Sequence, residues 1–469
     1  MAEFAVTLED KYSLNEGRVF ITGVQALARL PMVQRQRDVI SGLNTAGFIS
    51  GYRGSPVGGY DQQLWNARKF LENNHIKFQP GLNEDLAASA IWGSQQTNLF
   101  EGGKYDGVFG IWYGKGPGVD RCGDVFKHGN MSGPSKHGGV LLIAGDDHAA
   151  KSSTVPHQSE FAFMDASIPV LNPAGVQEIL DYGVLGFAMS RFSGCWVAFK
   201  TTAENMDSSA SIDVAPDRVN IEIPDFDIPD GGLHIRWPDD WIEQEHRLHN
   251  YKLKAVRAFA RANKIDKLII ESPEAKLGIV TTGKSYLDVR QALEDLGITE
   301  EKAATIGIRL YKIGMPWPLE PAGVREFAEG LEEILVIEEK RPLIENQLKE
   351  ELYNYPLNER PRIVGKLDEK QQPLQSAAGV LTATQIATVI ASRIAQFHQG
   401  SEIQQQLRII EAREAQLIQS KTDFARTPYF CSGCPHNTST KVPEGSRATA
   451  GIGCHFMSVW MDRDTSTFT

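Results

Sequence analysis

The sequence has no long apolar run and few cysteines, and these two scarcities exclude several classes of protein. No segment approaches the ~18 consecutive apolar residues of a membrane-spanning helix. The first residues, MAEFAVTLEDKYSL, are acidic where a secretory signal is basic and then apolar, so we expect a cytoplasmic protein. Five cysteines in 469 residues cannot form a disulfide framework.

Positive charge is also scarce. The sequence has 48 Lys and Arg residues and 59 Asp and Glu residues, which gives a formal net charge of -11. Nucleic acid and anionic membranes require a clustered basic surface, so we expect neither as a partner. Hydrophobic residues at 41% and charged residues at 23% are typical of a folded globular protein. A chain of this length exceeds one ordinary core and should divide into domains.

Short apolar runs alternate with amphipathic stretches up to about residue 225. The clearest runs are GFISGY, VFGIWYG and VLLIAG. Strands that alternate with helices form a mostly parallel sheet with helices on both faces, so the pattern predicts an α/β fold. Ligands of such sheets bind beyond the carboxyl ends of the strands. We therefore expect the site directly after these three runs.

Residues 216–240 are rich in proline, aspartate and glycine, which disfavour a helix. We therefore predict a domain boundary there. A second block of alternating strands and helices follows, and later a polar stretch with two helical segments. The predicted organisation is an α/β domain over 1–225, a linker over 226–244, a second α/β domain over 245–364, a helical connector over 365–426 and the truncated start of a third unit over 427–469.

Two loops of the first domain carry candidate site residues. The turn GYRGSPVGGY lets the backbone approach a ligand and offers the hydroxyl of Ser55, although an ordinary strand-to-helix loop has the same spacing. Glu84 follows Asn83, which caps a predicted helix, and a carboxylate there is already explained by the helix dipole. A catalytic role for Glu84 requires burial at a domain interface.

A third loop, YGKGPGVDRCGD, places Lys115 between glycines. Only one residue separates Gly116 from Gly118, so the dinucleotide fingerprint is absent and we reject a nicotinamide site. Lys115 could bind a substrate carboxylate or could be a solvated surface lysine. We interpret the acidic GDDH run, Asp146 to His148, as solvated or helix-capping rather than metal-binding.

The strongest signal is CSGCPHN followed by GIGCHF. Cys431 and Cys434 can chelate one soft metal centre, and Cys454 follows in a glycine-flanked loop. Zinc could take His436 or His455 as its fourth ligand, whereas an iron-sulfur cubane normally takes a further cysteine. Three unpaired or buried cysteines are the remaining alternative.

With these motifs in this order, the chain resembles the large fused indolepyruvate ferredoxin oxidoreductases, which depend on thiamine diphosphate. The resemblance implies a pyrimidine-binding domain, then a transketolase-C-terminal-like domain, then a diphosphate-binding domain. It also implies that Glu84 contacts N1′ of the cofactor, that Ser55 faces the oxoacid, and that Lys115 lies where relatives hold the substrate carboxylate. Arg53-Gly54-Ser55 departs from the usual pattern of that turn.

The resemblance further implies that Cys431, Cys434 and Cys454 ligate a [4Fe-4S] cluster. The implied reaction is oxidative decarboxylation of an aryl 2-oxoacid with coenzyme A, giving an aryl-acetyl-CoA and reduced ferredoxin, in an enzyme that is a homo-oligomer. The GDG run and asparagine that bind magnesium do not occur before Thr469, so we expect this polypeptide alone to be inactive. A non-oxidative thiamine-dependent decarboxylase and a zinc-stabilised interaction protein remain as alternatives.

Overall fold

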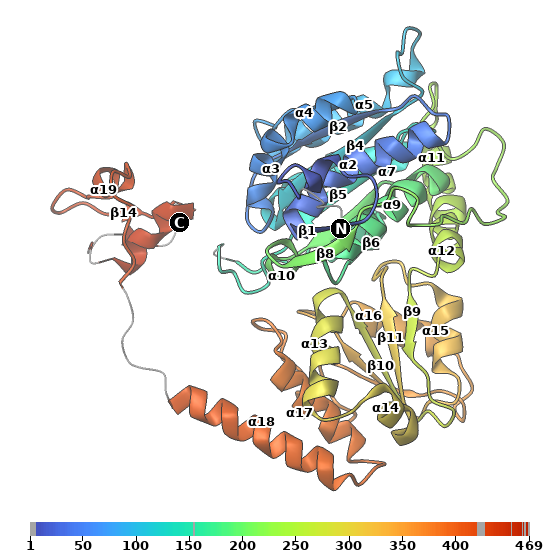
Figure 1. Ribbon diagram of the computed structural model, residues 1–469, viewed down its shortest axis with the longest axis vertical. Helices are drawn as coiled ribbons and strands as arrows, with labels where there is room; N and C mark the ends of the chain where they lie inside the picture. Colours follow the sequence, from blue (N-terminus) through green and yellow to red (C-terminus); the bar gives the residue numbers. More distant parts are fainter. Residues whose placement is uncertain are drawn as a thin grey trace.

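The computed structural model describes residues 6–152, 155–419, 427–451, 453–461, 463 and 466–467. Two separate sheets organise most of these residues, with the first sheet above the second in Figure 1. Both sheets are flanked by helices on their two faces, so the predicted α/β class is confirmed.

The first sheet has six parallel strands in the order β3-β2-β4-β5-β7-β6. Their bounds are β2 (Ala46–Gly51), β3 (Ile76–Phe78), β4 (Val108–Lys115), β5 (Val140–Gly145), β6 (Val170–Leu171) and β7 (Val197–Thr201). The central β5 reads VLLIAG and is buried throughout, because helices cover both of its faces. The three apolar runs singled out in the sequence therefore form three adjacent strands.

Helices cover this sheet in two layers, each with its own hydrophobic cluster. One layer holds α2 (Gly23–Ile40) and α9 (Val176–Ser193), which pack on each other. The other holds α5 (Glu84–Gln95) and α7 (Gly123–Ser132). A two-stranded antiparallel ribbon of β1 (Arg18–Thr22) and β8 (Ser209–Asp213) lies beside α2 and α9.

The chain between Asp213 and Trp241, all of it described, contains no helix or strand. It leads into α11 (Trp241–Arg247), a π-helical turn (Leu248–Lys252) and α12 (Leu253–Ala262), which packs on α9 of the first domain. The buried Lys252 ammonium donates to the backbone oxygens of Asn130 and Met131 at 3.2 and 2.9 Å. These bonds fix the helical segment to the first domain.

The second sheet has five strands in the order β13-β12-β10-β11-β9, and only β9 is antiparallel to its neighbour. Its strands are β9 (Lys267–Ile270), β10 (Leu277–Thr282), β11 (Ile308–Ile313), β12 (Glu333–Ile337) and β13 (Arg362–Val364). One face is covered by α13 (Gly283–Asp295), α14 (Glu300–Ile306) and α17 (Ala383–Ile394), and the other by α15 (Pro321–Ala328) and α16 (Ile344–Leu352).

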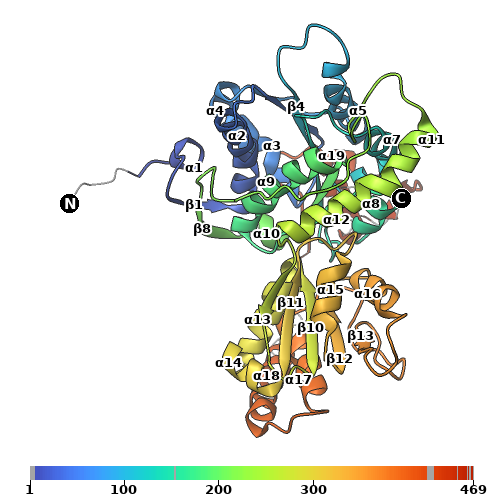
Figure 2. The same cartoon turned by 90° about the vertical axis from the view of Figure 1, so that its right-hand side faces the viewer.

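The two domains are joined by backbone hydrogen bonds at the carboxyl end of the second sheet. Val170 and Asn172 of the first domain donate their N–H groups to the carbonyls of Trp317 and Gly314, at 2.8 and 2.9 Å. The side view in Figure 2 shows β10 and β11 running up to this junction. The strands of the second sheet therefore end against the first domain.

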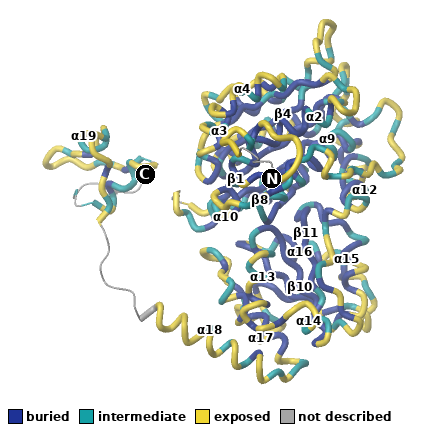
Figure 3. Tube along the Cα trace, viewed as in Figure 1, coloured by how far each residue is buried: buried dark blue, intermediate teal, exposed yellow. Residues whose placement is uncertain are grey.

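The remaining described elements lie after α17. Helix α18 (Ser401–Gln419) packs its first turns on α17, and its later turns are exposed in Figure 3. Beyond residue 426 the described residues form α19 (His436–Ser439), a 3₁₀ segment (Gly453–Trp460) and the short paired strands β14 (Ala448–Thr449) and β15 (Ser466–Thr467). Within the described ranges, no helix combines the length and apolar content needed to cross a bilayer.

Asp266, between α12 and β9, gives a test of the junction between the domains. Its Oδ1 accepts the backbone N–H groups of Gly314 and Met315, at 2.7 and 3.1 Å, while its buried Oδ2 has no partner. Burial raises the pKa of this carboxyl from 3.8 to about 7, although both N–H groups oppose the shift. The folded protein therefore binds a proton more tightly than the unfolded chain, and this group lowers stability as the pH rises from about 4 to about 7.

We expect Asp266→Asn to keep both backbone hydrogen bonds and to stabilise the protein by about 1–2 kcal/mol at pH 8, since one pKa unit corresponds to ~1.4 kcal/mol and solvent reaches part of the side chain. Urea unfolding at pH 5 and pH 8 measures the effect. The gain should shrink at pH 5. A loss of stability at both pH values would contradict the assignment.

Candidate active site at the carboxyl ends of the first sheet

The turn after β2 places Ser55 at the carboxyl edge of the first sheet. Buried Val57 and Tyr60 anchor the turn, and Ser55 itself is exposed. A methyl group on Gly54 would lie only 2.9 Å from Cβ of Lys115, so this turn packs directly on the end of β4. The absence of a side chain at Gly54 therefore permits the close approach of the two loops.

Lys115 is the last residue of β4, and its ammonium group is already held by the loop that follows β5. Its Nζ donates to the backbone oxygen and the hydroxyl of Ser152, at 2.7 and 2.9 Å. Asp147 Oδ2 lies 3.7 Å from the same nitrogen. Burial lowers the pKa of Lys115, and Asp147 counteracts the shift. A substrate carboxylate would have to share this ammonium with Ser152 and Asp147.

Glu84 is the first residue of α5, the helix that connects β3 to β4. Asn83 caps the helix by accepting the N–H of Leu86 at 2.9 Å, and the backbone oxygen of Glu84 accepts the indole N–H of Trp112 at 3.1 Å. The half-buried side chain lies against Gly118, where a methyl group would be 2.5 Å from its Cγ. The carboxylate thus lies beside the short helix α6 (Gly116–Arg121) that follows Lys115.

The structure therefore brings the three predicted residues to one edge of one sheet, through the contacts of Gly54 with Lys115 and of Gly118 with Glu84. Among the described residues, no hydrogen bond or ion pair directly links Ser55, Lys115 and Glu84 to one another. Such an arrangement can hold a ligand that reaches from an acid to a cation.

The loop after β5 contributes polar residues that the sequence reasoning did not select. Asp147 accepts the N–H and the hydroxyl of Ser152, at 2.7 and 2.9 Å, and so orients the partner of Lys115. His157 lies over Gly116, where a methyl group would be 2.3 Å from its Cγ, and its Nε2 is 3.2 Å from Asp120 Oδ2. These residues could have been predicted from the sequence, because their loop follows the apolar run VLLIAG directly.

The carboxylates of the GDDH run were expected to be solvated or to cap a helix, and Asp146 is not solvated. Asp146 and His148 are buried, with 1% and 6% of their surface exposed. Asp146 Oδ2 accepts the backbone N–H of Ser159 at 2.8 Å and lies 3.8 Å from the buried ammonium of Lys200. Later segments of the first domain bury Asp146, and residues of the second domain lie beside His148, so neither contact is visible in the local sequence.

The cysteines lie apart from this edge, in the C-terminal described residues. Cys431 and Cys434 occupy one turn, in which the N–H of Cys434 donates to the carbonyl of Cys431 at 3.0 Å. Cys434 Sγ lies 3.3 Å from His436 Nδ1, and the rings of His436 and His455 are 5.6 Å apart. Cys431 and Cys454 are exposed. In the described part of the chain, no three His, Cys, Asp or Glu side chains are grouped to hold a metal ion.

Comparison with known proteins identifies relatives for most of the chain. The family described as the indolepyruvate oxidoreductase domain matches residues 267–417, which hold the second sheet, α17 and most of α18. The indolepyruvate oxidoreductase subunit IorA of Pyrococcus horikoshii is 26% identical over 69% of this chain and 48% of its own length. The same subunit of Methanothermobacter marburgensis is 22% identical over 92% of this chain and 61% of its own length.

The chain spans about half the length of the Pyrococcus horikoshii subunit. Among solved structures, a 2-oxoglutarate:ferredoxin oxidoreductase from Magnetococcus marinus, with 2-oxoglutarate, coenzyme A and succinyl-CoA bound, has a TM-score of 0.57 and 15% identity. The structural match covers 80% of this chain and 65% of the Magnetococcus marinus chain, and it shows that the two share a fold. Over most of its length the chain is therefore similar to indolepyruvate oxidoreductases, the family that its sequence motifs predict.

Proposed function

We propose that this chain is part of a ferredoxin-dependent oxidoreductase that converts an aryl 2-oxoacid of the indolepyruvate type, with coenzyme A, into carbon dioxide and an aryl-acetyl-CoA. The observation that carries the proposal is the convergence of Ser55, Lys115 and Glu84 on one carboxyl edge of a parallel sheet. Ligands of parallel sheets bind at that edge.

The residues at this edge fit thiamine diphosphate. Glu84 is half-buried, pairs with no cation in the described structure and lies in a cradle made by Gly118, where any larger residue would displace it. When bound, the cofactor would supply the electron sink for decarboxylation. Glu84 would hold its aminopyrimidine ring by a hydrogen bond at N1′. Because its contacts in the described structure are within the first domain, a further domain or a second copy of the chain would have to supply the burial at an interface that this role requires.

The other two residues would bind the substrate. Lys115 would orient the carboxylate of the 2-oxoacid while Ser152 and Asp147 keep its ammonium in place. Ser55, exposed on the turn that packs against Lys115, would offer its hydroxyl to the keto oxygen. These roles concern binding and orientation, which supply a large part of an enzyme's rate enhancement.

The cysteines would hold a [4Fe-4S] cluster that passes electrons to ferredoxin. Thiolates are the donors that iron-sulfur clusters take, and Cys431 and Cys434 already share one turn. Cys454 would have to approach them, because the described residues present no assembled site. Magnesium would bind with the diphosphate, and we place the enzyme in the cytoplasm as a homo-oligomer.

The full-length protein that carries this sequence tests the proposal. Purified without oxygen and supplied with thiamine diphosphate, magnesium and coenzyme A, it should reduce a viologen dye with an aryl 2-oxoacid. Decarboxylation without dye reduction would favour the non-oxidative decarboxylase. Failure with every 2-oxoacid tried would reject the assignment.

Replacement of the CxxC pair tests the cluster separately. We expect Cys431→Ser with Cys434→Ser to remove most of the bound iron and the visible absorbance, and to abolish dye reduction, because serine is a poor ligand for iron-sulfur clusters. The matched control is Cys195→Ser, since this buried cysteine lies in the first domain. Zinc without iron in the unmodified protein would favour the zinc-stabilised alternative.

A further inference from the structure

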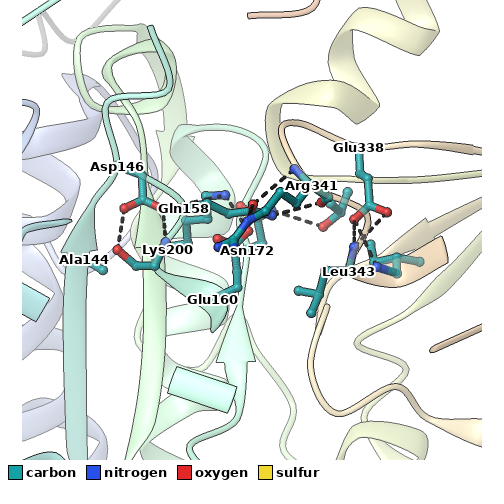
Figure 4. Close-up of polar contacts among 12 residues, drawn as sticks. Ala144, Asp146, Gln158, Glu160, Asn172, Lys200, Glu338, Arg341 and Leu343 are labelled. Atoms are coloured by element: carbon teal, nitrogen blue, oxygen red, sulfur yellow. Dashed lines mark hydrogen bonds and ion pairs between the residues drawn. The ribbon is translucent and has the colours of Figure 1, made fainter. Parts of the chain in front are cut away.

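A small cavity lies between the two domains, where the carboxyl ends of both sheets face each other. Its volume is about 20 Å³. The first domain lines it with residues that follow β5, β6 and β7, and the second with residues that follow β10 and β12. The lining that matters here is His148, Glu160, Lys200, Lys284, Ser285 and Glu338. Several of these residues appear in Figure 4.

Most charged groups around this cavity already have partners. The ammonium of Lys200 makes an ion pair with Glu160 Oε1. Glu338 accepts the backbone N–H groups of Leu343, Ile344 and Glu345, at 3.0–3.1 Å. These contacts fix the walls from both sides, so the cavity is not a gap between loosely placed loops.

Five polar atoms on four of the lining residues have no hydrogen-bond partner in the described structure. They are Nδ1 and Nε2 of His148, Oε2 of Glu160, Oγ of Ser285 and Oγ1 of Thr202. All four residues are buried, with 6%, 5%, 1% and 4% of their surfaces exposed. A buried polar atom without a hydrogen bond costs free energy, and native proteins rarely leave one unpaired. Five such atoms around one cavity indicate that it binds a small polar group.

The size and charge of the cavity select that group. A volume of about 20 Å³ fits one water molecule, which needs two to four polar partners. Lys200 and Lys284 disfavour a cation, and Glu160 and Glu338 disfavour an anion. Burial and four nearby lysines hold the pKa of His148 well below its usual value, so the neutral ring offers one donor and one acceptor.

We infer that this cavity binds a single ordered water molecule that links His148 and Glu160 of the first domain to Ser285 of the second. The water donates to the Glu160 carboxylate and to the unprotonated nitrogen of His148, and the Ser285 hydroxyl donates to it. Both domains then contribute ligands. The bound water supplies a partner for Glu160 Oε2, for one ring nitrogen of His148 and for the Ser285 hydroxyl.

The site also connects to the loop that holds Lys115. His148 is adjacent to Asp147, whose carboxylate binds Ser152 and lies near the Lys115 ammonium. A water bound by His148 and Ser285 therefore restrains that loop through the second domain. The inference does not depend on the reaction proposed above.

Oxygen-17 magnetic relaxation dispersion counts long-lived internal waters in solution and tests the inference. We expect His148→Leu, which fills the cavity and removes both ring nitrogens, to reduce that count by one molecule. Ser285→Ala should keep the water but shorten its residence time at least about threefold, because one of its partners is lost. A crystal structure at atomic resolution should show the water within hydrogen-bonding distance of all three residues.

The matched control is Ser272→Ala in the second domain. Ser272 is as buried as Ser285, but its hydroxyl donates to the carbonyl of Ala304 at 2.6 Å. This variant should leave the water count and the residence time unchanged. Equal counts in the unmodified protein and in His148→Leu, or an empty cavity in the crystal, would overturn the inference, even where the enzyme is active.

Discussion

Glu84→Gln is expected to lower 2-oxoacid oxidation by the full-length protein about 10²–10⁴-fold, the range that a lost acid–base contact typically costs. The amide keeps the size of the side chain but cannot act as an acid at the aminopyrimidine ring. The fold should be spared, because Trp112 bonds the backbone oxygen of Glu84 and Asn83 caps the helix through Leu86. Steady-state dye reduction with saturating cofactor measures the effect.

The neighbouring carboxylate is the control for this substitution. Asp85 lies one residue further along α5 and pairs with Arg121 at 3.4 Å on the surface. Asp85→Asn removes the same charge from the same first turn, so it alters the helix dipole equally but should keep most of the activity. If Glu84→Gln turns over within about threefold of the unmodified protein, Glu84 has no catalytic role. If both variants lose activity equally, the loss comes from the changed charge at the helix terminus.

The first sheet and the position of the site follow from local sequence. The runs that became β2, β4 and β5 are apolar because both faces of each strand are covered, and their order along the chain matches the order in the sheet. Ser55 and Lys115 could be predicted at one edge, since parallel strands end on the same side. Glu84 was found through family likeness, because a carboxylate after a helix cap has a complete structural explanation by itself.

The interdomain residues could not be predicted in the same way. Asp146 looks solvated in GDDH, yet it is buried and contacts Ser159 and Lys200, which come later in its own domain. His148 is buried beside Lys284 and Ser285 of the second domain, more than a hundred positions later in the chain. Lys200 ends an apolar strand and gives no local sign of its two acidic partners. Burial of this kind depends on how segments distant in the chain meet, which no periodicity within one segment encodes.

This buried charge cluster carries the largest expected effect on stability. Lys200 has 5% of its side chain exposed and faces Glu160 and Asp146, whose side chains are 6% and 0% exposed. Burial alone would lower the pKa of Lys200, but the two carboxylates raise it overall, whereas burial raises the pKa of Asp146. We expect Lys200→Met to destabilise the protein by about 3–5 kcal/mol at pH 8, because two buried carboxylates lose their cation.

Acid should relieve this loss, since a carboxyl group with a raised pKa in the folded state stabilises that state as it takes up a proton. The deficit in urea unfolding should therefore be smaller at pH 5 than at pH 8. Lys127→Met is the control, because Lys127 pairs with Asp165 on the surface, 2.6 Å away, and such pairs contribute at most about 1 kcal/mol. Adding Glu160→Leu to Lys200→Met should recover part of the loss, and no recovery at either pH would mean that packing rather than charge fixes Lys200.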